Sequence, residues 1–157
     1  MLKKCLIAFL ISMVPIIELR GALPIALASG VPAYIAYPVC VIGNMIPVPF
    51  IYFFARKLLE WGKDKKVIGK IFTFFLEKGH KGGEKLMGKA GKGGGLFIAL
   101  LLFVGIPLPG TGAWTGTLAA SILDMGFKKS SIAVMLGVIL AGIIMGVLTM
   151  LGINILT

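Results

Sequence analysis

The sequence has few of the residues that metalloproteins and hydrolytic enzymes depend on. Among 157 positions there are one histidine, two cysteines and six acidic residues. His80 lies in a Gly- and Lys-rich stretch without a second ligand at metal-binding spacing, and Cys5 and Cys40 lie apart in apolar runs. We therefore predict no metal site, no disulfide framework and no cofactor. Without a Ser/His/Asp set or a metal-ligand cluster, the sequence also argues against an enzyme.

Charge is also missing from long parts of the chain. Several windows of about twenty residues carry no charged side chain, which is typical of membrane spans. Hydrophobic residues make up 58% of the chain and the mean hydropathy is +1.01. A soluble domain is usually about 45–50% apolar. The composition therefore predicts a polytopic, all-α integral membrane protein.

The basic residues are concentrated in one polar segment. Eleven of the sixteen Lys and Arg residues, and four of the six acids, lie between Arg56 and Lys92. The positive-inside rule makes residues 56–95 a cytoplasmic loop. Its apolar positions recur at helical spacing, which predicts an amphipathic helix on an anionic lipid surface or on the protein's own cytoplasmic face. In so apolar a chain, this charge does not favour nucleic-acid binding.

Two apolar runs are broken in the middle. The run over residues 5–29 is interrupted at 18–24, and the run over 96–123 is interrupted at 107–112. Each arm is too short to cross a core of roughly 30 Å as a helix. We therefore predict two re-entrant helical hairpins, whose irregular backbone must line a cavity or be buried in protein. A single kinked helix over 5–29 is the alternative for the first run.

Each broken run is followed by an apolar run without acidic or basic residues. Residues 33–55 and 132–153 are predicted spans; prolines should kink the first, and small residues suit the second for packing within the chain or in a homodimer. The halves 1–55 and 96–157 would then be inverted about the basic loop, as in many transporters. This arrangement puts Lys3 and Lys4 outside, against the charge rule.

Charged and strongly turn-forming residues occupy the breaks. Glu18 is the candidate proton carrier, and Arg20 suits phosphate or carboxylate. Burial favours a neutral Glu18 and Arg20 favours its charged form, so the sequence leaves its state open. A permanent ion pair that only holds the hairpin is the alternative role. Half-helices starting near Pro24 and Gly112 would aim two positive dipole ends at an anion. The predicted substrate and proton path comprises Glu18, Arg20, Gly21, Pro24, Pro107, Pro109, Gly110, Thr111, Gly112, Trp114 and Thr115.

The two breaks carry a resemblance to a known family. Residues 17–24, reading IELRGALP, and residues 107–116, reading PLPGTGAWTG, resemble the two signature blocks of the putative small multi-drug export protein family. That family is similar, distantly, to the DedA/VTT membrane proteins, which have two facing re-entrant hairpins and in some cases move polyprenyl phosphate or other lipids. The resemblance implies a multi-pass transporter in a prokaryotic plasma membrane. This chain has one acid in the first block and none in the second, which weighs against a two-carboxylate proton relay.

Three functions follow from these observations. The first is a proton-linked secondary transporter of a small amphipathic or lipid-like cargo. The helix dipoles favour a cargo with a phosphate group, whereas the family name favours an amphipathic drug. The second is an uncoupled lipid flippase or scramblase, which needs no protonatable residue. The third is a membrane scaffold that docks partners on its basic loop.

Overall fold

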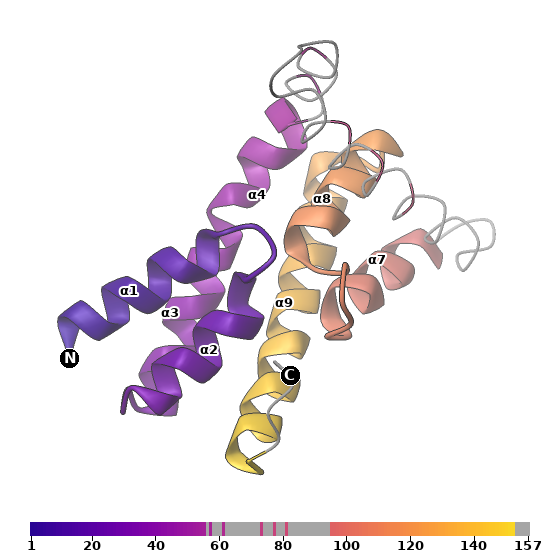
Figure 1. Ribbon diagram of the computed structural model, residues 1–157. Helices are drawn as coiled ribbons and strands as arrows, with labels where there is room; N and C mark the ends of the chain where they lie inside the picture. Colours follow the sequence, from indigo (N-terminus) through magenta and orange to yellow (C-terminus); the bar gives the residue numbers. More distant parts are fainter. Residues whose placement is uncertain are drawn as a thin grey trace.

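The computed structural model describes residues 1–55 and 95–152, together with positions 57, 61, 73, 77 and 81, and all regular structure in them is helical. The predicted amphipathic helix in the basic loop lies outside the described residues. Figure 1 shows the arrangement. The first half contains α1 (Leu2–Met13), α2 (Glu18–Ala28), α3 (Ala33–Met45), α4 (Pro47–Phe50) and the π-helical turn η1 (Ile51–Ala55). The second contains α7 (Gly95–Gly105), α8 (Ala113–Ile122) and α9 (Phe127–Met150).

Two of these helical segments are long and apolar enough to cross a membrane. They are Ala33–Phe54, with mean hydropathy 1.6, and Phe127–Met150, with mean hydropathy 2.6. The first changes geometry after Met45, where Pro47 and Pro49 remove two backbone donors. The second begins earlier than residue 132, because Gly126 supplies a start with φ +82°. Its first turn therefore includes Lys128 and Lys129, which lie before the span predicted over 132–153.

The first broken run folds as two antiparallel helices. The chain reverses at residues 14–17, and Lys4 Nζ, near the start of α1, donates to the Ser29 carbonyl beyond the end of α2 at 2.6 Å. One kinked helix over 5–29 would hold these two residues far apart, so that alternative is wrong. Ser12 near the end of α1 packs on α3, since a Cβ added at Gly43 would lie 2.1 Å from Ser12 Oγ.

The second broken run also folds back on itself. Helix α7 leads through residues 106–112 into α8, and Gly116 lets α8 approach α7 closely. A Cβ added at Gly116 would lie 2.6 Å from Val104 Cγ2. In Figure 1 the turns of the two hairpins point toward the middle of the molecule. Residues distant in sequence are thereby brought together at the two breaks.

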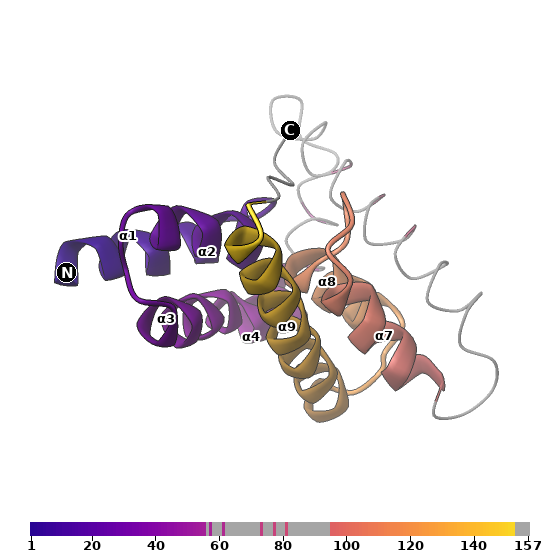
Figure 2. The ribbon, with the colours of Figure 1, turned by 90° about the horizontal axis from the view of Figure 1, so that it is seen from below.

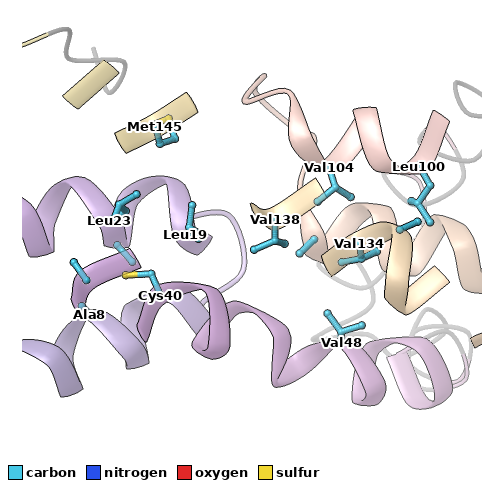
Figure 3. Packing of buried hydrophobic residues seen from close by; sticks show 14 of the residues in the cluster. Ala8, Leu19, Leu23, Cys40, Val48, Leu100, Val104, Val134, Val138 and Met145 are labelled. Atoms are coloured by element: carbon cyan, nitrogen blue, oxygen red, sulfur yellow. The ribbon is translucent and has the colours of Figure 1, made fainter. Parts of the chain in front are cut away.

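Helix α9 lies between the two hairpins. In Figure 2 helices α1, α2 and α3 lie on one side of it and α7 and α8 on the other. Figure 3 shows the same division in the core, with Leu19 and Leu23 on one side and Leu100 and Val104 on the other. The apolar contacts on both faces of α9 fix the positions of the two hairpin turns relative to each other.

Small residues on α9 pack within the chain. A Cβ added at Gly137 would lie 2.7 Å from Val104 Cβ, and one at Gly142 would lie 2.5 Å from Tyr37. The Tyr37 hydroxyl donates to the Ile139 carbonyl at 2.7 Å, which ties α3 to α9 at the same place. Of the two uses predicted for this small-residue face, the structure shows the intramolecular one.

Candidate functional site

The Glu18 carboxylate of the first hairpin caps the first turn of a helix in the second. Its Oε2 accepts from the Ala113 amide at 3.1 Å, and its Oε1 accepts from the Trp114 amide at 3.0 Å. The first amides of a helix have no partner within it, and the helix dipole adds positive potential there. Gly112, at the N-cap position, has no side chain to supply this cap. Glu18, which is only 5% exposed, supplies the cap instead, although it lies 95 residues earlier in the sequence than Ala113.

Arg20 holds the loop that leads into the same helix. Its guanidinium donates to the Leu108 carbonyl and, at 2.8 Å, to Thr111 Oγ1. Thr111 Oγ1 in turn donates to carbonyls within its own loop, at 2.8 Å to Leu108 and 3.0 Å to Ile106. Arg20 therefore fixes a loop that already carries its own hydrogen bonds. The two signature segments meet through a carboxylate on backbone amides and a guanidinium on backbone and hydroxyl oxygens.

Glycine is required where the two segments touch. Gly112 has φ +139°, a conformation that other residues rarely adopt. A Cβ added there would lie 2.3 Å from Glu18 Oε2. Glycine thus allows both the turn and the approach of the carboxylate to the helix.

The turn of the first hairpin is strained instead. Ile16 has φ +80° and Glu18 has φ +51°, and for a β-branched residue such as Ile16 this is a conformational outlier. Non-glycine residues in this region cost of order 1–3 kcal/mol and gather at functional sites. The strained turn is what presents the Glu18 side chain to the second hairpin.

The remaining predicted site residues lie in the same two hairpins. Pro107, Pro109, Gly110 and Thr111 lie in the loop between α7 and α8, with Pro109 and Gly110 exposed. Trp114 and Thr115 lie half-buried in the first turn of α8. Gly21 is buried in α2, where an added Cβ would lie 2.5 Å from Ile17 Cγ2. Among the predicted site residues of the first hairpin, Glu18 and Arg20 make the polar links at the junction, which is the place where the two hairpin turns meet.

Two details of the predicted dipole arrangement are wrong. Helix α2 begins at Glu18, so Pro24 lies inside it and not at its start. Helix α8 does begin at Ala113, but its first amides already bind the Glu18 carboxylate. In this conformation the α8 terminus is therefore not open to a ligand anion. The alternative role, a direct ion pair, is also not seen, since among residues 1–55 and 95–152 Glu18 and Arg20 each bond to the second hairpin and not to each other.

Sequence reasoning missed the backbone groups that complete the junction. The residue types at these positions do not indicate that the Ala113 amide and the Leu108 carbonyl would be used as hydrogen-bond partners. One indirect signal existed, because the stretch before α8 reads Gly-Thr-Gly and puts glycine at the cap position. A helix start buried without a local cap needs an acceptor from elsewhere, and Glu18 is the single acid outside the basic loop within an apolar run.

A comparison with family models gives one match, to the family described as Putative small multi-drug export protein, over residues 18–144. The chain belongs to this family. The matched region begins at Glu18, so it covers the first signature segment except Ile17, all of the second, and the residues whose hydrogen bonds are described above. Searches of curated proteins and of solved structures each gave no significant match.

Membership gives a coarse functional statement. The family description names an export protein, and two of the described helices are long and apolar enough to cross a membrane; both features fit a membrane transporter. Proteins described as exporters are usually not enzymes.

Proposed function

We propose that this chain is a proton-coupled secondary transporter of the prokaryotic plasma membrane, with its cargo site at the junction of the two hairpin turns. The observation that carries the proposal is the Glu18 carboxylate, buried in an apolar chain and bonded to the Ala113 and Trp114 amides. An ionisable group at membrane depth is expensive and is functional by default. Here it also links two hairpins that are far apart in the sequence.

The packing favours an inverted pair of re-entrant hairpins. Helix α2 packs against α3 of its own half and α9 of the other. Correspondingly, α8 packs against α9 of its own half and the α4–η1 segment of the other. Such exchange between halves is typical of transporters with inverted repeats, whose cargo binds at the interface between repeats. In this arrangement each hairpin enters and leaves on one side, and residues 56–95 face the cytoplasm and its anionic lipids.

Coupling follows from what protonation does to the junction. The charged carboxylate is a strong acceptor for the α8 amides, and charge-assisted bonds are about twice as strong as neutral ones. Protonation of Glu18 weakens both bonds and frees the start of α8. A cargo phosphate or carboxylate then has the Ala113 and Trp114 amides and the Arg20 guanidinium as donors. Proton and anionic headgroup thus control the same amides, which links their movement.

An apolar body suits the rest of the junction. Ile106 and Leu108 in the second loop are 41% and 54% exposed, and Ile16 and Ile17 in the first turn are 76% and 42% exposed. These side chains offer apolar contact beside the polar group. The cargo class that fits is therefore a small amphipathic or lipid-like molecule with an anionic headgroup.

The test is transport by the purified full chain in proteoliposomes under an imposed pH gradient. A polyprenyl phosphate and the lipophilic cation ethidium are compared as cargo. The proposal expects proton-driven movement of the phosphate by wild type and by the control Glu77→Gln, whose site is exposed, and loss of movement in Glu18→Gln. Movement of ethidium alone would assign a cationic cargo.

Other outcomes favour the alternative functions. Movement of the phosphate without a gradient, retained in Glu18→Gln, would replace coupled transport by an uncoupled lipid flippase. If neither cargo moves and neither raises the melting temperature of the protein, a scaffold that uses the basic loop is the better assignment.

A further inference from the structure

Buried polar atoms without a partner occur along helix α8 and the helices beside it. Within residues 1–55 and 95–152, Asn44 Oδ1, Thr117 Oγ1 and Ser130 Oγ have no hydrogen-bond partner. Their residues are 2%, 0% and 1% exposed. Leaving such an atom unpaired is unfavourable, because it has lost its hydrogen bonds to bulk water without gaining a partner. Native proteins normally satisfy such groups, and ordered water is a common partner.

Thr117 lies on a polar face of α8 that starts at the Glu18 contact. Ala113, Thr117 and Ser121 are one helical turn apart, so they share a face. At the start of this face the Ala113 amide donates to Glu18. At its end the Ser121 hydroxyl donates to the Tyr52 carbonyl at 2.7 Å. Helix α8 therefore runs from the Glu18 junction toward η1.

Asn44 lies near the end of α3, just before the α4 and η1 turns that pack against α8. It lies eight residues before Tyr52 in the same Ala33–Phe54 segment. Its neighbour Gly43 packs on Ser12, close to the turn that leads into Glu18. The α4–η1 segment packs along α8. Asn44 is thus placed toward the start of α8, as Tyr52 is placed at its end.

Ser130 continues the line on α9. It lies two turns before Gly137, whose added Cβ would meet Val104 and the Leu101 carbonyl. The shared face of α9 is therefore directed at the α7–α8 hairpin. Just before Ser130, the exposed residues Asp124, Lys128 and Lys129 mark the connection between α8 and α9. The line of polar groups ends beside charged, exposed side chains.

We propose that Asn44, Thr117, Ser121 and Ser130 line a file of water, the α8 polar track, that connects Glu18 with the aqueous phase at the α8–α9 connection. Water in the track satisfies the unpaired oxygens and carries a proton from solvent to Glu18 Oε1 or Oε2. The titratable and charged groups at its inner end are Glu18 and Arg20, and those at its outer end are Asp124, Lys128 and Lys129. Use of the track in coupling rests on the proposed transport function, whereas its hydration does not.

The first test measures hydration without any transport. Thr117→Cys and Ser130→Cys are made in a full chain whose own thiols are removed by Cys5→Ser and Cys40→Ala, and folding is checked by size exclusion. A small methanethiosulfonate ethylammonium reagent should label both cysteines in proteoliposomes from the side of the α8–α9 connection. The matched control is Ala119→Cys, on the same helix at a residue that is 0% exposed and apolar. It should stay unlabelled.

Two labelling results would overturn the proposal that the α8 polar track holds water. If Thr117→Cys and Ser130→Cys are folded but inert, the buried hydroxyls are dry and the inference is wrong. Equal labelling of Ala119→Cys would show general opening of the helix and would overturn it as well.

The second test asks whether the α8 polar track carries the proton during transport, which is a separate question from whether it holds water. Thr117→Val should lower proton-driven transport about fivefold, which corresponds to ~1 kcal/mol in a rate barrier. The control Thr149→Val removes a hydroxyl that bonds the Met145 carbonyl on the far part of α9, and transport should be unchanged. Labelling of Thr117→Cys together with full activity of Glu18→Gln would leave the track standing and refute proton coupling. An unaffected Thr117→Val in a chain that needs Glu18 would refute the track as the proton route.

Discussion

The two hairpins have similar shapes but contribute opposite chemistry. The α1–α2 hairpin supplies charged side chains, Glu18 and Arg20, from a turn that contains no glycine. The α7–α8 hairpin supplies backbone amides and carbonyls from a loop with glycine at 110 and 112, both at positive φ. The first hairpin supplies the side chains that bind, and the second supplies mainly the backbone groups to which they bind. This explains how a single acid serves both halves, and why the second signature segment needs none.

The two hairpin turns also differ in backbone strain. The first turn holds two strained residues, Ile16 and Glu18, at positive φ. The second turn reaches positive φ with glycine, which is not strained there. The first hairpin is therefore held in place by its partner as well as by its own sequence. Three changes to the junction test this difference, in order of expected effect.

The largest effect is expected for Gly112→Ala. The new Cβ would lie 2.3 Å from Glu18 Oε2 and would force a positive φ on alanine. We expect a loss of about 3 kcal/mol in unfolding free energy, from backbone strain together with displacement of the carboxylate. Thermal unfolding in detergent measures it. The control Gly126→Ala has φ +82° and nothing within 4 Å of its added Cβ, so it shows the strain alone. Equal losses in the two variants would contradict the contact between the hairpins.

A smaller effect tests the Arg20 side of the junction. Arg20→Ala and Thr111→Val each remove one partner of a hydrogen bond, and each should cost about 1 kcal/mol. Because the two residues are in contact, the double variant should be less destabilised than the sum by about 0.5–1 kcal/mol. The same cycle with Thr115→Val serves as control and should be additive. Additivity in the Thr111 cycle as well would mean that Arg20 does not hold the loop.

The smallest effect is expected at Ile16. Its side chain is 76% exposed, so Ile16→Gly loses little packing and relieves a β-branched residue at φ +80°. We expect the free energy of unfolding to rise by about 0.5–1 kcal/mol. Ile17→Gly has no such strain to relieve at φ −73°, and should lower it. A loss of transport in a more stable Ile16→Gly variant would identify the strain as functional.

The sequence alone determined the class of the protein and the parts of it that matter. Apolar runs without charge indicated a helical membrane protein, and two helices long enough to span are present. The breaks at 18–24 and 107–112 carried the family resemblance that the match over residues 18–144 confirms. These features are local: they depend on composition and on residues within about twenty positions of one another.

Only the tertiary structure decided how the breaks meet. Glu18 selects the Ala113 and Trp114 amides, and Arg20 selects the Leu108 carbonyl, across about ninety positions of chain. Every residue except proline has the same backbone donor, so residue types could not indicate which amides would be used. The start of α2 at Glu18 was likewise hidden, because its turn places Ile16 in a conformation that its sequence disfavours. Packing on the two faces of α9 sets these positions, and it depends on the whole fold.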